Sequence, residues 1–286
     1  MSGRLQVLTA AVLFSTAGMV VKATALTAWQ VAGFRSAVAA LFLLVVARMP
    51  LRPTKRTLGI GLVIAVTFIT FILANKLTTA AHAVFLQAAA PVYLVLLGPW
   101  LLGERVHMTD LPFLGVVIVG LLLLFAGSIE PSATAPNPVL GNIVAASSGV
   151  TWALVLIGVR YISRDGGDAA MTATFYGNVF AFLLCAPLAF PVVGARPVDW
   201  AVIGYLGCFQ LALAYVMLAR GIGKLHALEA SLLLLLEPAL NPLWTFLVHG
   251  ETPGVLGSIG GGLVLVATTV RALRPPTREP VPIVPA

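Results

Sequence analysis

The stretch Pro91–Glu104, PVYLVLLGPWLLGE, has a counterpart of equal length in Pro238–Glu251, PALNPLWTFLVHGE. In both, a proline inside a long apolar run is followed thirteen positions later by the glutamate of a Gly-Glu pair. A glycine then follows eleven positions after each glutamate, at Gly115 and Gly262. A spacing that recurs in this way indicates that one half of the chain is a copy of the other.

The composition places both halves in a membrane. Of the 286 residues 59% are hydrophobic and only 9% are charged, and the mean hydropathy is +1.02. A soluble domain carries roughly 25% charged residues, so this chain has too few to cover a surface that faces water. The cysteines, Cys185 and Cys208, lie inside apolar runs, where they are expected to be small core residues rather than a disulfide. The sequence has no metal-ligand cluster, phosphate-binding loop or catalytic triad, and we expect no cofactor.

Apolar runs divide the chain into about ten segments, each near the ~20 residues that a helix needs to cross a bilayer. Turn or charge signals separate the segments, and the ten-residue alternation of β-barrel strands is absent. The first segment is longer than the core of a secretory signal and has a match in the second half, so we interpret it as a helix. The fold class is therefore an all-α membrane protein with ten transmembrane helices. They are expected at about 5–21, 30–47, 58–75, 82–102, 111–128, 139–159, 170–190, 198–218, 227–248 and 254–271.

The basic residues predict the orientation of these helices. With the amino terminus inside, 13 of the 17 lysines and arginines fall in the inner segments and 3 in the outer ones, while Arg35 lies within the second helix. This positive-inside bias predicts a multi-pass protein of the bacterial inner membrane with both termini in the cytoplasm. The net charge of +7 is explained by this topology and by anionic lipid. No clustered basic face of the kind that nucleic-acid binding requires is present.

The duplication predicts the organisation of the chain. The first repeat spans 4–128, a linker spans 129–138, the second repeat spans 139–272, and 273–286 form a cytoplasmic tail that is expected to be disordered. Because each repeat holds five helices, the second inserts upside down, which places Glu104 on the inner side and Glu251 on the outer side. Inverted repeats can exchange conformations and so produce inward-open and outward-open states. The Pro-rich linker is interpreted as a surface connection rather than a gate.

Three stretches resemble the EamA-type branch of the drug/metabolite transporter superfamily: Ala74–Ala81 (ANKLTTAA), the run from Pro91 to Gly103-Glu104, and the run from Glu237-Pro238 to Gly250-Glu251. The resemblance covers nearly the whole chain as two EamA repeats. It implies ten helices around a central cavity lined mostly by the first, third, fourth, sixth, eighth and ninth. The chain is most similar to amino-acid exporters of the YddG type. One departure is that Ala90 precedes Pro91 where Glu237 precedes Pro238, so a role of that glutamate is not duplicated.

Glu237 is the sharpest candidate for a functional side chain. It follows five consecutive leucines near the middle of a predicted helix, where a charge costs roughly 2.5–3.5 kcal/mol unless it meets a partner or a cavity. Pro238 removes a backbone donor and frees carbonyls of the preceding turn. Glu237, Asn241 and Trp244 share one helix face, and together they can hold an ammonium group or a coupled proton. The alternative is a structural carboxyl that is neutral or bonded to a neighbouring helix.

The fourth predicted helix carries the counterparts of these groups. Gln87 lies near mid-span, shares a face with Pro91 and is a cavity candidate, flanked by Tyr93, which can equally face lipid. His82 lies at the outer end and titrates in the physiological range. An outer gate linked to a proton is conceivable there, but we favour a histidine that faces lipid headgroups.

In the sixth predicted helix Ser148, Thr151 and Trp152 share a face, and the first helix offers Ser15 and Met19 in a similar way. An aromatic ring beside small hydroxyls suits the apolar or aromatic side chain of a substrate. Packing against a neighbouring helix explains the same pattern.

The remaining polar residues have simpler interpretations. Lys22 and Lys76 are expected to extend to the outer headgroups, and for Arg35 an outward, structural placement is favoured over binding of a substrate carboxylate. Gln210 and Tyr215 are possible cavity contacts. The glycines of the tenth helix favour packing within the molecule over dimerisation, so we expect a monomer or weak dimer.

The sequence thus predicts a secondary transporter and not an enzyme. The expected partners are the bilayer and a small-molecule substrate, with a coupled proton as an open alternative to a simple substrate gradient. The best substrates are neutral or aromatic amino acids, and export is the expected direction. Other metabolites or drugs, such as nucleosides and cationic compounds, are the alternative. An intramembrane enzyme would need clustered catalytic groups, and a channel would need a charged ring or a carbonyl filter; the sequence shows neither.

Overall fold

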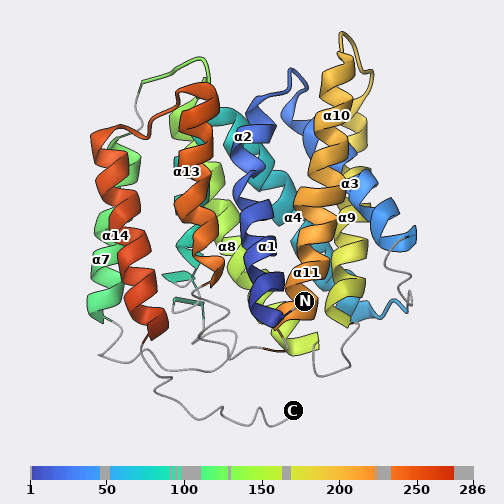
Figure 1. Ribbon diagram of the computed structural model, residues 1–286, viewed down its shortest axis with the longest axis horizontal. Helices are drawn as coiled ribbons and strands as arrows, with labels where there is room; N and C mark the ends of the chain where they lie inside the picture. Colours follow the sequence, from blue (N-terminus) through green and yellow to red (C-terminus); the bar gives the residue numbers. More distant parts are fainter. Residues whose placement is uncertain are drawn as a thin grey trace.

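The computed structural model of the chain is a bundle of helices that run up and down beside one another (Figure 1). It describes residues 2–45, 52–90, 92–93, 96–97, 111–127, 130–162, 169–222, 224 and 233–273. The helices are α1 (Gly3–Ser15), α2 (Ala17–Lys22), α3 (Ala28–Val45), α4 (Lys55–Leu77), α5 (Ala80–Ala88), α7 (Leu111–Ala126), α8 (Pro138–Ile162), α9 (Ala169–Ala189), α10 (Pro197–Tyr205), the π-helical segment η3 (Leu206–Leu213), α11 (Ala214–Ile222), α13 (Leu236–His249) and α14 (Gly254–Leu273). We call the end where α1 begins the lower end of the bundle, and the end where α2 finishes the upper end.

Each of the ten expected apolar segments contains a helix. The pair α1–α2 forms the first segment, and α10, η3 and α11 together form the eighth. Within the described residues, six helical stretches are long and apolar enough to cross a membrane, and α7 and α14 contain shorter apolar stretches. The six are Gly3–Lys22, Ala28–Val45, Lys55–Leu77, Pro138–Val159, Ala169–Ala189 and Pro197–Gly221. The prediction of an all-α, multi-pass membrane protein is confirmed.

Local sequence explains where several helices begin and end. Thr54 and Thr57 form a reciprocal capping box at the start of α4, and the Thr79 hydroxyl caps α5 by accepting from the backbone N–H of His82 at 3.2 Å. Such caps satisfy backbone donors that have no partner within the helix. At the other end of a helix, Gly250 stops α13 in a left-handed conformation with φ of 64°, which glycine adopts without steric cost.

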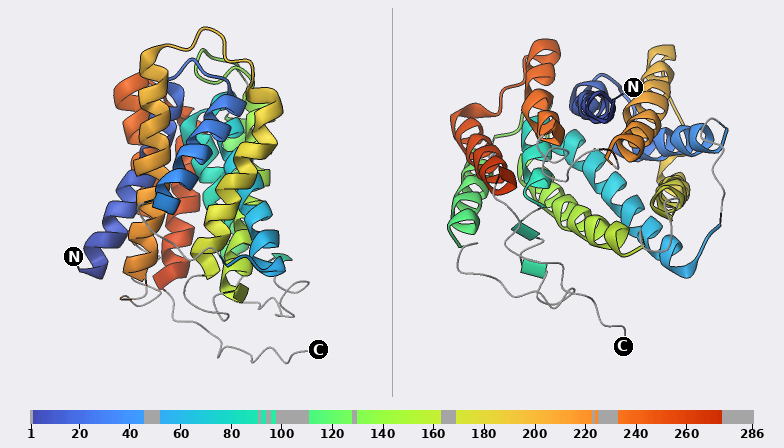
Figure 2. Two further views of the ribbon diagram at one scale, coloured as in Figure 1. Left: turned by 90° about the vertical axis from the view of Figure 1, so that its right-hand side faces the viewer. Right: turned by 60° about the horizontal axis from the view of Figure 1, so that its bottom comes forward.

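The helices meet in an order that encloses a central space. α4 packs against α8 and α9, α3 packs against α9, and α1 packs against α11 and α13. α7 and α14 pair with each other and stand at one edge of the bundle (Figure 2). Large apolar side chains on the outside are exposed, among them Leu122 at 64% and Val255 at 77%, as expected where lipid replaces water.

Small residues allow the closest helix contacts. A Cβ added to Gly260 of α14 would lie 2.5 Å from the backbone oxygen of Gly120 in α7, and one added to Gly261 would overlap the ring of Phe85. Gly257 faces the ring of His82 in α5. Gly257, Gly260 and Gly261 of α14 therefore pack against other helices of the molecule, as the interpretation favoured from the sequence predicts.

We predict that Gly260→Ala lowers the thermal unfolding temperature of the purified protein in detergent, whereas Gly262→Ala does not. Both changes gain a similar helix propensity of roughly 1 kcal/mol. Gly262 has open space around its Cα, whereas an alanine at 260 meets the backbone of α7. Equal unfolding temperatures for the two variants would show that α7 and α14 do not approach this closely.

Candidate functional site

A cavity of about 330 Å³ lies between helices from both halves of the chain. Its lining extends from the middle of the bundle into the lower half, because Trp152 and Leu156 belong to later turns of α8 and Leu218 belongs to α11. The aromatic lining residues are Phe14, Phe68, Phe71, Trp152 and Tyr215. The other polar or charged lining residues are Arg35, Thr67, Gln87, Gln210, Glu237 and Thr268.

Glu237 reaches this cavity from the first turn of α13, beside the buried ring of Pro238. Among the described residues the carboxylate has no hydrogen-bond or ion-pair partner. An acidic side chain that lines a cavity without a partner remains available to a solute or a proton.

Gln87 enters the cavity from α5 and is held by α8. Its amide nitrogen donates to the Ser148 hydroxyl at 2.8 Å, and that hydroxyl donates in turn to the Thr67 carbonyl in α4 at 3.4 Å. Trp152 lies one turn further along α8 and also lines the cavity. Phe14 of α1 is on the lining as well, so both halves of the chain contribute aromatic side chains to the cavity.

Arg35 is turned inward, and the expectation that it extends outward is wrong. The side chain is only 1% exposed, and its guanidinium donates to the Gln210 side-chain oxygen at 3.3 Å and to the Phe68 carbonyl at 3.2 Å. It also lies 5.7 Å from the centre of the Phe68 ring. This direction arises because the face of α3 that carries Arg35 packs against η3 and α4 rather than against lipid.

Gln210 belongs to the π-helical segment η3, which interrupts the α-helix between α10 and α11. Such wide turns are frequent at functional sites because they redirect side chains that a regular helix would place elsewhere. Tyr215 follows in α11, and its ring packs edge-on against Phe14 at 5.2 Å and Phe68 at 5.8 Å. The sequence contained one signal for Arg35, since a charge inside an apolar segment is rare, but it contained no signal for the π-helical turn.

Several residues predicted for the cavity lie at helix contacts instead. Asn241 is fully buried, with its amide directed at Gly18 of α2. The Trp244 indole N–H donates to the Ser15 hydroxyl at 2.9 Å, and the backbone oxygen of Met19 contacts a ring nitrogen of His249 at 2.8 Å. The predicted polar face of α13 therefore lies against α1 and α2, and only Glu237 at its lower end reaches the cavity.

Three further predicted residues are also absent from the cavity lining. The Thr151 hydroxyl donates to the Ser148 carbonyl in its own helix at 3.0 Å, and the Tyr93 ring packs against Gly149. His82 is 1% exposed between Thr79 and Gly257, so the expectation that it faces headgroups is wrong. Pro91 and Glu104 lie outside the described residues.

A buried ion pair closes the upper end of the bundle. The Lys22 ammonium lies 3.0 Å from the Glu251 carboxylate, and both side chains are less than 5% exposed. Glu251 also accepts the backbone N–H of Ala80 at 2.6 Å, and Lys22 donates to the backbone oxygens of Thr78 and Thr134. These bonds join the ends of α2, α4, α5 and α13 and attach the linker to them.

A second polar cluster lies at the same end. Lys76 donates to the Thr24 carbonyl at 2.7 Å, the Thr24 hydroxyl donates to Asp199 at 2.9 Å, and Arg196 pairs with Asp199 at 3.1 Å. The expectation that Lys22 extends to headgroups is therefore wrong, because Glu251 and backbone acceptors within the protein satisfy its ammonium group. Lys76 is half-buried and donates to one acceptor. We refer to Lys22, Glu251, Thr78, Thr134, Lys76, Thr24 and Asp199 as the upper seal.

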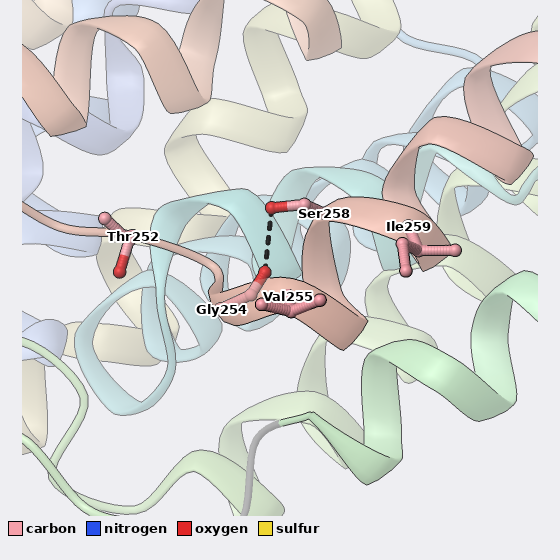
Figure 3. A pocket seen from close by; sticks show the side chains of 5 residues that line it. All are labelled: Thr252, Gly254, Val255, Ser258 and Ile259. Carbon is pink, nitrogen blue, oxygen red and sulfur yellow. Dashed lines mark hydrogen bonds between the residues drawn. The ribbon is translucent and has the colours of Figure 1, made fainter.

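A second hollow lies at the start of α14 and is lined by Thr252, Gly254, Val255, Ser258 and Ile259 (Figure 3). The Ser258 hydroxyl donates to the Gly254 carbonyl within the same helix at 2.8 Å. The hollow carries no charged side chain and shares no residue with the central cavity. We assign it no function.

The helices and the cavity define a multi-pass membrane protein whose two halves enclose a partly polar central site. The sequence matches the model of the EamA-like transporter family over residues 1–126 and 139–272. The chain therefore belongs to this family of transporters. The family indicates a transporter rather than an enzyme.

Relatives with known names support the same class. The chain is 29% identical to an uncharacterized transporter of Archaeoglobus fulgidus over 77% of each chain. It is 26% identical to the pseudopaline exporter CntI of Pseudomonas aeruginosa over 93% of this chain and 94% of the relative. It is 29% identical to a probable terminal-alkyne amino-acid exporter of Streptantibioticus cattleyicolor over 64% of this chain and 61% of the relative. A solved crystal structure has the same fold, with a TM-score of 0.64 and 20% identity over 94% of this chain and 96% of that one.

We predict that Lys22→Met and Glu251→Gln each lower the thermal unfolding temperature in detergent, because each leaves a buried partner without its countercharge. Breaking a buried pair from one side costs roughly 3–5 kcal/mol. The double variant is expected to lose clearly less stability than the sum of the losses in the two single variants. A double-mutant cycle measured by intrinsic fluorescence tests this coupling, and strictly additive losses would contradict the pair.

Proposed function

We propose that the protein is a secondary transporter that exports neutral and aromatic amino acids across the bacterial inner membrane by alternating access. The central cavity is the observation that carries this proposal. Its volume lies at the lower end of the roughly 300–1,000 Å³ typical of small-molecule sites. Aromatic walls can hold an apolar side chain, while Glu237 and Gln87 can hold polar groups of the cargo.

The pairing of helices supports an inverted repeat. α3 pairs with α9 and α7 pairs with α14, and each pair joins the same position of the two halves. The contact of α4 with α8 has its counterpart in the contact of α11 with α1. The contact of α5 with α8 likewise corresponds to that of α13 with α1. A twofold relation of this kind is what exchange between two open states requires.

The positive-inside bias assigns the lower end to the cytoplasm and the upper end to the periplasm. With this orientation, the upper seal closes the cavity toward the periplasm, and the conformation is one that precedes outward release. Opening toward the periplasm requires the Lys22–Glu251 pair to separate. His82 lies beside this region, where it is bonded to Thr79 and packed against α14. We therefore include His82 in the proposed outer gate.

The sequence also bears on the energy source for transport. The sequence carries no nucleotide-binding motif, so movement is driven by the substrate gradient or by a coupled ion. Glu237 is the proposed proton carrier, since its carboxylate lines the cavity and has no partner among the residues that the structure describes. Two relatives are named as exporters, one of them for a terminal-alkyne amino acid, and this supports both the direction and the cargo class.

We predict that proteoliposomes containing the protein release labelled phenylalanine and leucine faster than a nucleoside, a lipophilic cation or a sugar phosphate. Glu237→Gln is expected to slow this release, because it removes a charged contact worth roughly 1.5–3 kcal/mol, or about tenfold or more. Glu130→Gln is the matched control, since Glu130 lies exposed in the linker, outside the cavity lining. Release at equal rates by the two variants, with both proteins monodisperse, would assign Glu237 a structural role. Preferential release of the nucleoside or the cation would show that amino acids are not the main cargo.

A further inference from the structure

We propose that Arg35 anchors a carboxylate of the cargo. The cavity then selects solutes that carry both an ammonium and a carboxylate over amines and amides of the same shape. This inference rests on the proposed function and specifies which groups of the cargo the site recognises.

The first step is that no carboxylate in the described part of the chain compensates the charge of Arg35. Its partners are the Gln210 amide oxygen, the Phe68 carbonyl and the Phe68 ring. A cation at this depth is costly unless an anion or water completes its surroundings. Since Arg35 lines the cavity, an anion bound there supplies the missing charge.

The second step is that Arg35 has donors left to give. A guanidinium carries five N–H donors in a planar fork that matches a carboxylate. The hydrogen bonds to Gln210 and Phe68 use one donor on each terminal nitrogen, and the Nε donor is buried without a partner among the described residues. A cargo carboxylate can therefore bind without displacing the contacts that orient the side chain.

The third step is that the surrounding backbone is built to hold Arg35 in place. A Cβ added to Gly207 of η3 would lie 2.7 Å from the Arg35 carbonyl oxygen, so η3 lies directly against α3 at this level. The π-helical turn that begins beside Gly207 then brings Gln210 to the guanidinium. Gln210 is a positioning residue, because it acts on the cargo through Arg35.

The fourth step is the separation of the two charges. Arg35 and Glu237 line the same cavity, yet no ion pair joins them. Tyr215 lines the same cavity. A solute with an ammonium near Glu237 and a carboxylate at Arg35 satisfies both charges at once. A solute with only a positive charge is attracted by Glu237 but repelled by Arg35. A solute with only a negative charge is attracted by Arg35 but repelled by Glu237.

The test compares three ligands that share one ring: phenylalanine, phenylalaninamide and 3-phenylpropionate. Their binding to the purified full-length protein is measured by calorimetry. The wild type is expected to prefer phenylalanine to its amide by about tenfold or more. Arg35→Gln is expected to lower the affinity for phenylalanine by at least about thirtyfold and to change the affinity for phenylalaninamide by less than about threefold. The preference for phenylalanine over its amide is then lost. Arg35→Lys is expected to retain part of the preference for phenylalanine, because lysine keeps the positive charge but lacks the planar set of donors of the guanidinium.

Arg52→Gln is the matched control, since Arg52 is exposed and lies outside the cavity lining. It should leave all three affinities unchanged. If Arg35→Gln does not fold, Gln210→Met keeps the charge while removing its orienting partner, and should reduce the preference for phenylalanine over the amide. An undiminished preference for phenylalanine in Gln210→Met, or equal losses of affinity for phenylalanine and for the amide in Arg35→Gln, would overturn the anchor.

The two proposals fail in different ways. If 3-phenylpropionate binds in an Arg35-dependent manner while no amino acid is released from proteoliposomes, the anchor stands and the proposed cargo is wrong. If amino acids are released and their binding does not depend on Arg35, the function stands and the anchor is wrong. If none of the carboxylates binds to the wild type, the anchor is wrong.

Discussion

Charged side chains inside the membrane-spanning helices set the condition on which the rest of this structure depends. Each must have a partner or face a cavity, because lipid offers neither water nor countercharge. Lys22 and Glu251 meet the condition by pairing with each other at the upper end. Arg35 and Glu237 meet it by facing the central cavity. The same rule therefore locates both the closed end of the bundle and the site where cargo is proposed to bind.

These two solutions have different mechanical consequences. The upper seal joins four helix ends and the linker through one ion pair and several backbone acceptors, so it favours a single arrangement of that end. The cavity leaves the charges of Arg35 and Glu237 without a countercharge among the described residues. A cargo that satisfies both charges makes the occupied state more favourable than the empty one. In the proposed mechanism, cargo favours opening of the seal because it binds the outward-open state more tightly than the closed one, since only such a difference in affinity shifts a conformational equilibrium.

The sequence predicts the helices well, because each needs about 20 apolar residues and the intervening turns are marked by charge, proline or glycine. It also singles out Glu237, Gln87 and Trp152, all of which line the cavity. It does not predict which neighbour each face meets. Glu237 and Asn241 share a face of α13 as predicted, but Asn241 packs against Gly18 and only Glu237 lines the cavity.

Long-range partners explain the other differences. Lys22 can reach headgroups from its helix end, but Glu251, which the fold brings near, pairs with it instead. For Arg35, the decisive contact is with Gln210 on a π-helical turn, and a regular helical repeat applied to the sequence cannot show such a turn. Periodicity within one segment predicts a face, whereas the partner of that face depends on the tertiary arrangement.

Access to one cavity position from both sides of the membrane tests the central claim most directly. Ala88 lines the cavity, and Ala88→Cys in a background with Cys185 and Cys208 replaced by alanine provides a single thiol there. In oriented vesicles, a thiol reagent that cannot cross the membrane should label this cysteine from either side, and phenylalanine should slow both reactions. Labelling from one side only, with or without phenylalanine, would contradict alternating access through this cavity.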